Sequence, residues 1–488
     1  MASWCVSRMP RMAKRAWAAM ALLVTTAGCS FAPAYHPPVM PTVTAFKEAG
    51  PWQPATPADT APRGDWWAVF SDPTLDALER KIATDNPSYA GALARYDAAR
   101  GYLGQSRAAL LPQVGVDAGI TRNRQSDNRP LRGANQPDIY SADTVEASLG
   151  YELDLWGRVR NSVAAGKAEV QASGDDLAAI RLSLQAELAT DFMALRGYDR
   201  QAVLLTQTVD AFAKADHLIQ RRFQGGIVSG IETSRSGAQL AEARAQLADV
   251  AASRALTEHA IASLVGTPAS SFTIAPVATD FDVPAVPLGL PATLIERRPD
   301  VAAAERRVAA ANAGIGVAKA AFFPAIRLGA SGGFQNTGLP GLFSAPNQIW
   351  SIGPSALLTL FDGGRRRAQL AVARARWASA GADYRATVLT AFQQVEDNLA
   401  LLHHLGDEAT AQDEAVRQAA MTERLSLNRY SKGAVTYLEV FTAQTTALQA
   451  RRAALDLDTR RLQASIRLIR ALGGGWTSGD HLAPAIDQ

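Results

Sequence analysis

The sequence predicts a mainly helical chain with two long helical hairpins and two pairs of β-strands, built by internal duplication. Two long tracts lack proline, between Pro137 and Pro268 and between Pro354 and Pro484. Each tract can therefore hold helices far longer than those of a typical globular domain. Apolar residues recur at helical spacing within the tracts, and short stretches of apolar–polar alternation precede them. The two halves of the chain also match each other at fixed offsets.

The duplication is visible in two sets of matching residues. The hairpin tracts match at an offset of 207 residues, in the pairs Arg222/Arg429, Gly226/Gly433, Glu232/Glu439 and Gly266/Gly473. Upstream segments match at an offset of 212, in the pairs Pro87/Pro299, Arg95/Arg307, Ala98/Ala310, Ala99/Ala311 and Pro112/Pro324. A single length change of five residues, between Pro112 and Gly157, accounts for both offsets. Register held over about 180 positions indicates an internal repeat.

Length and composition agree with this fold class. The chain has 488 residues, of which 48% are apolar and only 7% aromatic. Such a composition suits long helices in close contact. Residues 1–28 hold four basic residues and no acid, so the rest of the chain is nearly balanced despite a formal charge of +3. The charge composition therefore gives no indication of a nucleic-acid-binding surface.

The first 28 residues are interpreted as a secretory signal. Basic residues precede an apolar run from Ala16 to Val24, and small residues follow it. A transmembrane anchor is the less favoured alternative, because a span needs about 20 apolar residues. The segment Thr26–Cys29 resembles a lipoprotein signal-peptidase site, although Thr26 stands where Leu is usual. Cys29 is therefore predicted to be the lipidated first residue of the mature chain.

The remaining chain divides into alternating segments. A Pro-rich tether is expected over residues 29–64, and the first copy then supplies a helix with an equatorial part (65–112), a strand pair (113–155) and a hairpin (156–266). A Pro-rich equatorial linker (267–291) leads to the second copy's helix (292–324), strand pair (325–362), hairpin (363–473) and equatorial tail (474–488). If unbroken from Gly157 to Phe223, the first long helix would measure roughly 100 Å.

The strands alternate between apolar and polar residues. Val145, Ala147, Leu149, Tyr151 and Leu153 share one face of their strand, and Glu146, Ser148, Gly150, Glu152 and Asp154 share the other. This pattern fits a water-filled membrane barrel, and an ordinary half-buried sheet is the alternative. The strand near Trp350–Phe361 is expected to be interrupted by Pro354.

The strand count has a consequence for assembly. No stretch after the signal is long and apolar enough for a transmembrane helix, so any spanning part must be β. Four strands cannot close a barrel, and an open sheet edge cannot lie in lipid. An eight-stranded barrel is filled by side chains, so a conducting pore favours three chains and twelve strands.

Several motifs resemble one protein family, the outer-membrane factors of tripartite efflux pumps. Its lipoprotein branch, of the NodT or OprM type with a TolC-like fold, is the most similar. The matching segments are Trp66–Leu75, Leu294–Val301, Ala303–Glu305, Ala311–Gly316, Ala321–Pro324, Trp350–Pro354, Leu360–Arg365 and Ala471–Trp476.

The resemblance implies the assembly and its partners. It implies a homotrimer with a twelve-stranded barrel in the outer membrane, continuous with a twelve-helix α-barrel that extends into the periplasm of a Gram-negative bacterium. The expected partners are a periplasmic adaptor, an inner-membrane transporter of the RND type, and outer-membrane lipid. A protein-secretion duct of the type I systems and a non-conducting coiled-coil lipoprotein are the alternatives. The sequence does not identify the cargo.

Catalytic and metal-binding motifs are not found. The histidines are His36, His217, His259, His403, His404 and His481. None is expected to lie with cysteines or carboxylates at metal-ligand spacing, and His403 and His404 are predicted to point to different helix faces. No phosphate loop or nucleophile elbow occurs, and Gly473–Gly475 is interpreted as a helix stop. We therefore expect no metal, no cofactor besides the lipid on Cys29, and no enzymatic activity.

Arginines follow each predicted junction between strand and helix. They are Arg158 and Arg160 in the first copy and Arg365, Arg366 and Arg367 in the second. Cations are disfavoured at a helix N-terminus by the macrodipole, so something should compensate them. Local pairing with Asp154 and Asp362 and contact with anionic lipid headgroups are both open.

The resemblance also implies the position of a pore constriction. In the family, the tunnel narrows just after the turn of the second hairpin, and the matching residues here are Leu438, Glu439 and Thr442. Glu232 occupies the same depth in the first hairpin, where an outer helix face is the favoured alternative. Crowded carboxylates repel one another, so Leu438 is the expected apolar plug.

Overall fold

The computed structural model describes residues 30–39, 46–48, 65–126, 128, 137–284 and 298–474. The predicted signal, Cys29, most of the tether, residues 285–291 of the linker and the tail beyond Gly474 lie outside these ranges. The chain divides into two compact units, and each is described by itself. Among the described helices, none combines the length and the apolar character needed to cross a membrane.

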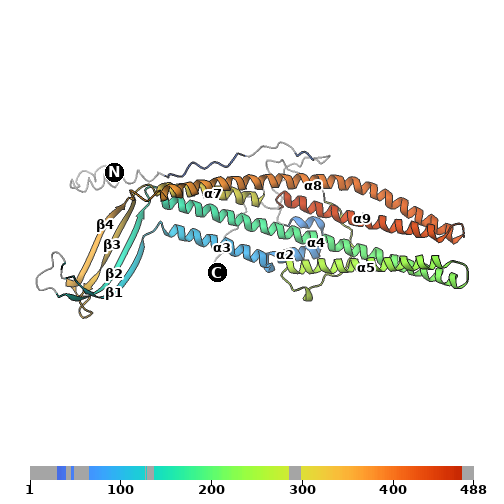
Figure 1. The fold of residues 1–488 in the computed structure, drawn as a ribbon, viewed down its shortest axis with the longest axis horizontal. Coiled ribbons are helices and arrows are strands. Elements are labelled where there is room, and N and C mark those ends of the chain that lie inside the picture. Colours follow the sequence, from blue (N-terminus) through green and yellow to red (C-terminus); the bar gives the residue numbers. More distant parts are fainter. Residues whose placement is uncertain are drawn as a thin grey trace, which may run out of the picture. The chain divides into compact units, whose positions relative to one another are not determined.

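The first unit contains residues 1–39, 97–172 and 304–384 and is centred on one antiparallel sheet. Its strands follow chain order and pair β1-β2-β3-β4, as Figure 1 shows. Their bounds are β1 (Gln113–Arg124), β2 (Ile139–Leu153), β3 (Ala325–Asn336) and β4 (Gln348–Leu357), with the short helix η3 (Ala345–Asn347) before β4.

The register gives the sheet two chemically different faces. Residues directly opposite each other on neighbouring strands share a face. One such row contains Val114, Leu149, Ala330 and Ile352, and the adjacent row on the same face contains Val116, Ala147, Gly332 and Trp350. The row between them, on the other face, contains Gly115, Ser148, Ser331 and Ser351. The predicted alternation is therefore confirmed, and it extends across all four strands.

Pro354 does not interrupt the last strand, so that prediction is wrong. Pro354 lies within β4, opposite Leu328 of β3. Because β4 is an edge strand among the described strands, one of its sides has no neighbouring strand there, and a missing N–H is tolerated. The strand ends at Leu357, before Phe361.

The helices confirm the duplication in their lengths. Their bounds are α2 (Pro73–Asp85), α3 (Pro87–Ala108), α4 (Arg158–Gln224), α5 (Gly230–Leu264), α7 (Pro299–Ala320), α8 (Arg365–Ser431) and α9 (Tyr437–Ala471). The structure also describes the short helices η1 (Trp66–Phe70) and η2 (Ala269–Ser271). Both α4 and α8 have 67 residues, and both α5 and α9 have 35. Every bound of these four helices repeats at the offset of 207 residues.

The two hairpin turns are built alike. Gly226 and Gly433 have φ of 70° and 72°, a conformation that side chains rarely adopt. The next amide in each turn reaches back to an arginine carbonyl, Ile227 N to Arg222 O and Ala434 N to Arg429 O, both at 2.9 Å. This hydrogen bond closes the end of each long helix and reverses the chain. The repeated arginine and glycine positions in the sequence thus mark two equivalent turns.

The second unit contains residues 40–96, 173–303 and 385–488 and carries the largest apolar clusters. The main cluster joins Trp67 and the α2 residues Leu75 and Ile82 to Leu188 and Phe192 of α4. A second cluster packs Phe46 against α8 and α9. In Figure 1 each long helix returns as the shorter helix of its hairpin. The apolar residues that recur at helical spacing in the first long helix therefore face a core.

Candidate functional site

The predicted constriction residues share an exposed surface at the start of α9. Leu438, Glu439 and Thr442 are all exposed, whereas Tyr437 and Val440 beside them are buried. The hydroxyl of Thr442 donates to the backbone oxygen of Leu438 at 2.9 Å. Its donor is therefore satisfied within the helix, and Leu438 and Thr442 lie one turn apart on one face.

Glu439 has a cationic neighbour that the sequence analysis did not identify. Nη1 of Arg429, the residue whose carbonyl closes the hairpin turn, lies 4.0 Å from Oε2 of Glu439. Both side chains are more than half exposed. Such an exposed pair contributes little stability, but it places a positive charge beside the carboxylate that was expected to face only others of its kind.

Glu232 has a different environment from its repeat partner. It is half-buried, and its Oε2 atom is shielded from solvent without a hydrogen-bond partner among the described residues. Within those residues, no hydrogen bond or ion pair joins Glu232 to Glu439. The two carboxylates occupy equivalent positions of the repeat, but Glu439 is exposed and Glu232 is half-buried.

A polar network ties the two hairpins together near their turns. Arg222 donates from Nη1 to the hydroxyl of Tyr430 at 3.3 Å and lies over its ring, with 5.4 Å from Cζ to the centroid. Tyr430 packs edge-on against Tyr437, at 5.7 Å between centroids. The Tyr437 hydroxyl donates to Oε1 of Gln239 at 3.0 Å, and burial raises the pKa of Tyr437 to about 12. These partners lie about 200 residues apart in the chain, so local patterns could not identify them.

The first junction between sheet and helix, in the first unit, is closed by Asp154. Its carboxylate accepts from the backbone amides of Val159 at 3.0 Å and Arg160 at 2.8 Å, and from Nε of Arg160 at 3.1 Å. Arg158 instead donates twice to Glu152, at 2.7 and 2.8 Å. Carboxylates at the start of α4 thus offset the unfavourable arginines.

The second junction uses Asp362 in the same way. It accepts from the amides of Gly364 at 3.1 Å and Arg366 at 3.2 Å and from Nε of Arg366 at 2.7 Å. The hydrogen bond from Arg366 is the main reason that the pKa of Asp362 lies below its usual range. Arg365 and Arg367 are exposed and have no acidic partner in the part of the chain that the structure describes. Local pairing therefore accounts for Arg160 and Arg366, and Arg158 pairs with Glu152 rather than Asp154.

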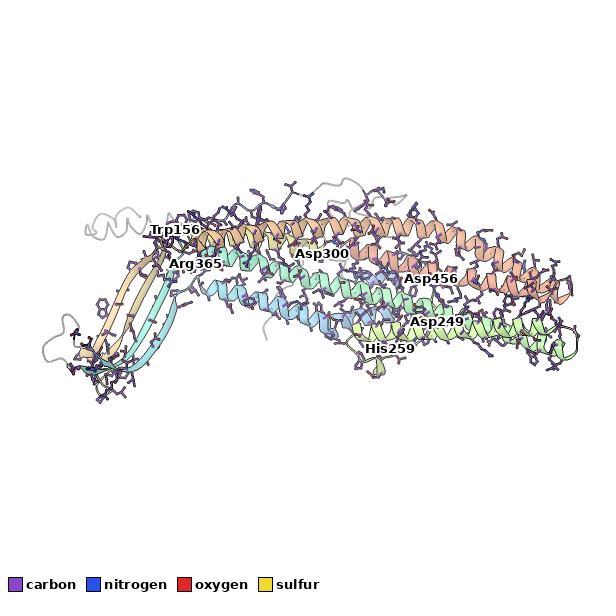
Figure 2. The ribbon with its side chains drawn as sticks, in the orientation of Figure 1. Trp156, Asp249, His259, Asp300, Arg365 and Asp456 are labelled. Atoms are coloured by element: carbon purple, nitrogen blue, oxygen red, sulfur yellow. The ribbon has the colours of Figure 1, made fainter. Side chains whose placement is uncertain are left out.

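An aromatic stack holds the N-terminal stretch at the same junction. Phe31 stacks on Phe323 with 4.4 Å between centroids, and Trp156 stacks on Phe323 at 5.0 Å. Nε1 of Trp156 donates to the carbonyl of Pro324 at 2.7 Å, just before β3 begins. Ser30 donates to Oδ1 of Asn161 at 3.0 Å. Figure 2 shows Trp156 and Arg365 where the strands give way to the long helices.

The histidine pair departs from its prediction. His403, His404 and Asp407 offer ligand atoms that all lie within 4.8 Å of one another. The expectation that no carboxylate lies at metal-ligand spacing from these histidines is therefore wrong, whereas the two histidines, as adjacent residues, do project about 100° apart around the helix. Asp407 follows His403 by four residues and His404 by three, so it neighbours both on the helix surface.

Comparisons with known proteins agree with this geometry. The chain matches the outer membrane efflux protein family over residues 79–267 and 290–474. It is 33% identical to the outer membrane protein OprJ of Pseudomonas aeruginosa, over 96% of this chain and 98% of that protein. It is 30% identical to the probable efflux pump outer membrane protein SepC of Pseudomonas putida, over 95% of this chain and 97% of that protein.

A solved structure gives the same result. The crystal structure of a membrane protein from Pseudomonas aeruginosa superposes with a TM-score of 0.84 at 32% identity, covering 93% of this chain and 100% of that one. The family consists of outer-membrane channel proteins rather than enzymes. With matches along nearly its whole length, the chain belongs to the outer membrane efflux protein family and is an outer-membrane channel component of an efflux pump, with a TolC-like fold.

Proposed function

We propose that three copies of this chain form the exit duct of a tripartite efflux pump. The observation that carries the proposal is the open sheet with one apolar face. β1 pairs only with β2 and β4 only with β3 within the described chain, so both edges keep unpaired backbone groups. Val114, Val116, Trp350 and Ile352, on those two edge strands, are each about 70% exposed. Closing the edges against neighbouring chains satisfies the backbone and turns the apolar face toward lipid.

The duct works with two further proteins and with lipid. A periplasmic adaptor docks on it, and an inner-membrane transporter of the RND type supplies the energy. The duct itself catalyses no reaction and holds no cofactor besides the lipid on Cys29. A type I protein-secretion duct is the alternative with the same fold, and the adjacent adaptor and transporter genes distinguish the two.

Lipidation of Cys29 is the first finer part of the proposal. The stretch that follows this cysteine in sequence is held at the strand ends by the Phe31–Phe323 stack and the Ser30–Asn161 hydrogen bond. An acylated residue preceding Ser30 would enter lipid beside the sheet. Mass spectrometry of the purified protein should find a diacylated or triacylated Cys29 as the first residue. An unmodified cysteine or a retained signal would rule this out.

The constriction is the second finer part. Leu438, Glu439 and Thr442 present an apolar, an acidic and a satisfied hydroxyl group on one exposed surface of α9. Facing the pore, three copies of Leu438 would plug it and three copies of Glu439 would favour cations. Glu232 holds the matching repeat position of the first hairpin and is half-buried in α5, so we expect it to lie on an outer helix face and the barrier to lie on the second hairpin.

Single-channel recording in planar bilayers tests both the duct and its constriction. The wild-type trimer should conduct with cation preference, and the Leu438→Ala/Glu439→Ala variant should conduct more and select less. The matched control is Ile231→Ala/Glu232→Ala, at the repeat positions of the first hairpin, which should leave both quantities nearly unchanged. No conductance from assembled wild-type trimers would favour the alternative of a non-conducting coiled-coil lipoprotein. Equal effects of the two variants would place the barrier on both hairpins.

A further inference from the structure

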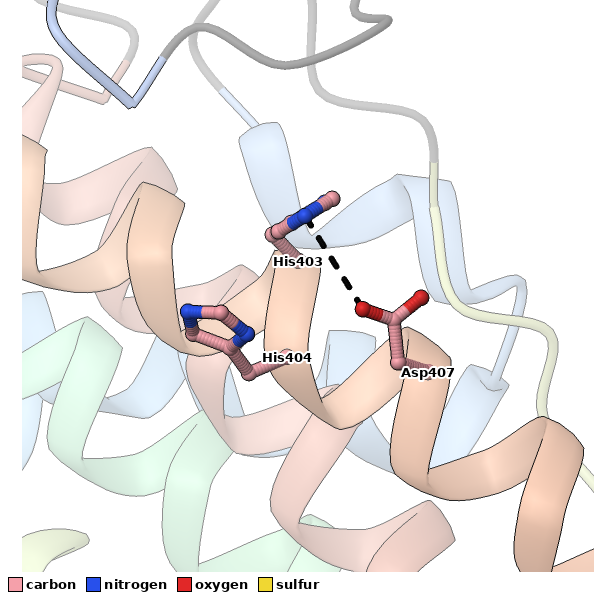
Figure 3. A group of neighbouring side chains, drawn as sticks. All are labelled: His403, His404 and Asp407. Atoms are coloured by element: carbon pink, nitrogen blue, oxygen red, sulfur yellow. Dashed lines mark ion pairs between the residues drawn. The ribbon is translucent and has the colours of Figure 1, made fainter.

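The one described cluster of metal-ligating side chains lies on α8, far in sequence from the constriction and from the junctions. Figure 3 shows His403, His404 and Asp407 on adjacent turns of this helix. Nε2 of His403 lies 3.9 Å from Oδ2 of Asp407, and the two imidazole centroids lie 5.2 Å apart. His403 is half-exposed, and His404 and Asp407 are exposed, so a solvated ion can reach all three.

Helix geometry explains why these three side chains converge. At about 100° per residue, Asp407 projects about 40° from His403 and about 60° from His404, between the two rings. The flanking residues Leu402 and Leu405 are buried in the cluster with Phe46 and fix which face of α8 points inward. The three polar residues therefore lie on the opposite side of the helix, and their orientation does not depend on a flexible loop.

We propose that His403, His404 and Asp407 form a binding site for a divalent transition-metal ion. Two imidazoles and one carboxylate match the donors that Zn²⁺, Ni²⁺ and Cu²⁺ accept and are poor donors for Mg²⁺ and Ca²⁺. Ligands at about 2.0–2.2 Å from a metal cannot be more than about 4.4 Å apart, so the exposed side chains need only small rotations to close on the ion. Water completes the coordination, since no other acidic or histidine side chain in the described chain joins this group.

The carboxylate is available for a metal. Its one ion-pair partner among the described residues is His403, with Asp407 itself 74% exposed. The neighbouring Glu408 is instead engaged by Arg460 of α9 at 3.2 Å. No lysine or arginine of the described chain therefore competes for Asp407.

The repeat shows that this chemistry is specific to the second copy. The residues at the equivalent positions of α4, 207 residues earlier, are Arg196, Gly197 and Arg200. Both arginines are buried and paired with acids, Arg196 with Asp199 and Arg200 with Asp280 and Asp458. The first copy uses this level of the helix to bury positive charge, and the second copy exposes three ligands there.

Equilibrium dialysis of the purified full-length protein with Cu²⁺, Ni²⁺ or Zn²⁺ tests the site. The protein must be stripped with a chelator and must carry no histidine tag. We expect about one ion per chain, with Cu²⁺ bound more tightly than Ni²⁺ or Zn²⁺. Asp407→Asn and His404→Ala should each weaken binding at least about tenfold. Electron paramagnetic resonance of the Cu²⁺ form should show coupling to two nitrogens, reduced to one by His404→Ala.

His217→Ala is the matched control. This exposed histidine of α4 has Lys214 and Arg221 one turn away rather than a carboxylate, so its loss should change neither affinity nor spectrum. Either of two results would overturn the proposal. One is no stoichiometric binding at 100-fold excess of all three metals, and the other is unchanged binding in a His403→Ala/His404→Ala variant whose circular dichroism matches wild type.

Discussion

The two copies of the repeat have helices that begin and end at equivalent positions, but they differ in the charged residues that they bury. In the first copy, Glu79, Asp175, Arg196, Asp199 and Arg200 are buried charged residues, and Asp143 of β2 is buried as well. In the described part of the second copy, Arg298 is the only buried charged residue. Phe192 of α4 and its repeat partner Leu399 of α8 are both fully buried. Duplication has kept the apolar seam while the polar positions diverged.

For Arg196, Asp199 and Arg200, burial goes with contacts to the segment that follows α5. Arg196 donates to the carbonyl of Ala275 at 2.9 Å, and Arg254 donates to the carbonyl of Ile274 at 2.7 Å. The amide of Val277 in turn donates to Asp199 at 3.1 Å. This segment shields the charged side chains from water. Those side chains in turn serve as hydrogen-bond partners for the backbone groups of the segment. A buried charge therefore marks where a chain segment lies across the helix.

The largest expected effect comes from removing the centre of this buried network. Asp199 accepts from Nη1 of Arg196 at 3.1 Å and from Nε of Arg254 at 2.6 Å. Asp199→Ala leaves both guanidinium groups without their shared acid, which should cost about 3–5 kcal/mol of unfolding free energy. Urea unfolding in detergent, followed by circular dichroism, measures this. The control Glu414→Ala removes an exposed partner of Arg417 and should leave the midpoint unchanged, and equal midpoints for the two variants would refute the network's role.

A second test uses the buried carboxyl group of the first copy. Desolvation by burial raises the pKa of Glu79 to about 9. The folded state then keeps a proton that the unfolded state releases above its ordinary value near 4.5, so stability should fall as pH rises from about 5 to 9. Glu79→Gln should flatten this dependence, whereas Glu408→Gln, on the exposed surface of α8, should not. Urea midpoints at pH 5, 7 and 9 decide it, and a slope that survives in Glu79→Gln would contradict the prediction.

The junctions offer a smaller and more local comparison. Asp154→Ala removes the acceptor of two backbone amides at the start of α4, which should cost about 1 kcal/mol. Asp362→Ala should act equally at the start of α8, because it removes two amide acceptors as well. Hydrogen exchange should show several-fold faster exchange in the first turn of only the affected helix. Faster exchange throughout either hairpin would mean that these residues support more than a cap.

The smallest effect on stability is expected at the exposed arginines. Arg365→Glu/Arg367→Glu breaks no ion pair in the described chain, so helix content in detergent should be unchanged. If these side chains contact anionic headgroups, insertion into vesicles that contain anionic lipid should slow, and insertion into neutral vesicles should not. Arg366→Glu is the contrast, because it also breaks the pair with Asp362. Equal insertion of wild type and the double variant would leave local solvation as the explanation.

Much of the fold could be predicted from the sequence because it rests on local patterns. Helix lengths follow from the absence of proline and from the apolar spacing, and the glycines at 226 and 433 mark the turns. The effect of Pro354 could not be predicted, because an edge strand is defined by its neighbours and not by its own residues. The Arg222–Tyr430 and Tyr437–Gln239 contacts join different hairpins, and no pattern within either one reveals them. The His403–Asp407 pair could have been predicted from the sequence, since a spacing of four residues on a helix is a local signal.

The helices α4 and α8 are equal in length, and so are α5 and α9. This equality indicates where the chain tolerates the insertion or loss of residues. Inserting one residue into α4 would turn every later side chain by about 100° and shift it by about 1.5 Å along the axis. The side chains of α4 that now pack against α5 would then point in other directions. The five-residue difference between the copies falls where β1 and β3, both of 12 residues, lead into the loops and strands that follow. The second strand of each pair differs in length, with 15 residues in β2 and 10 in β4, whereas the matching helices of the two copies keep equal lengths.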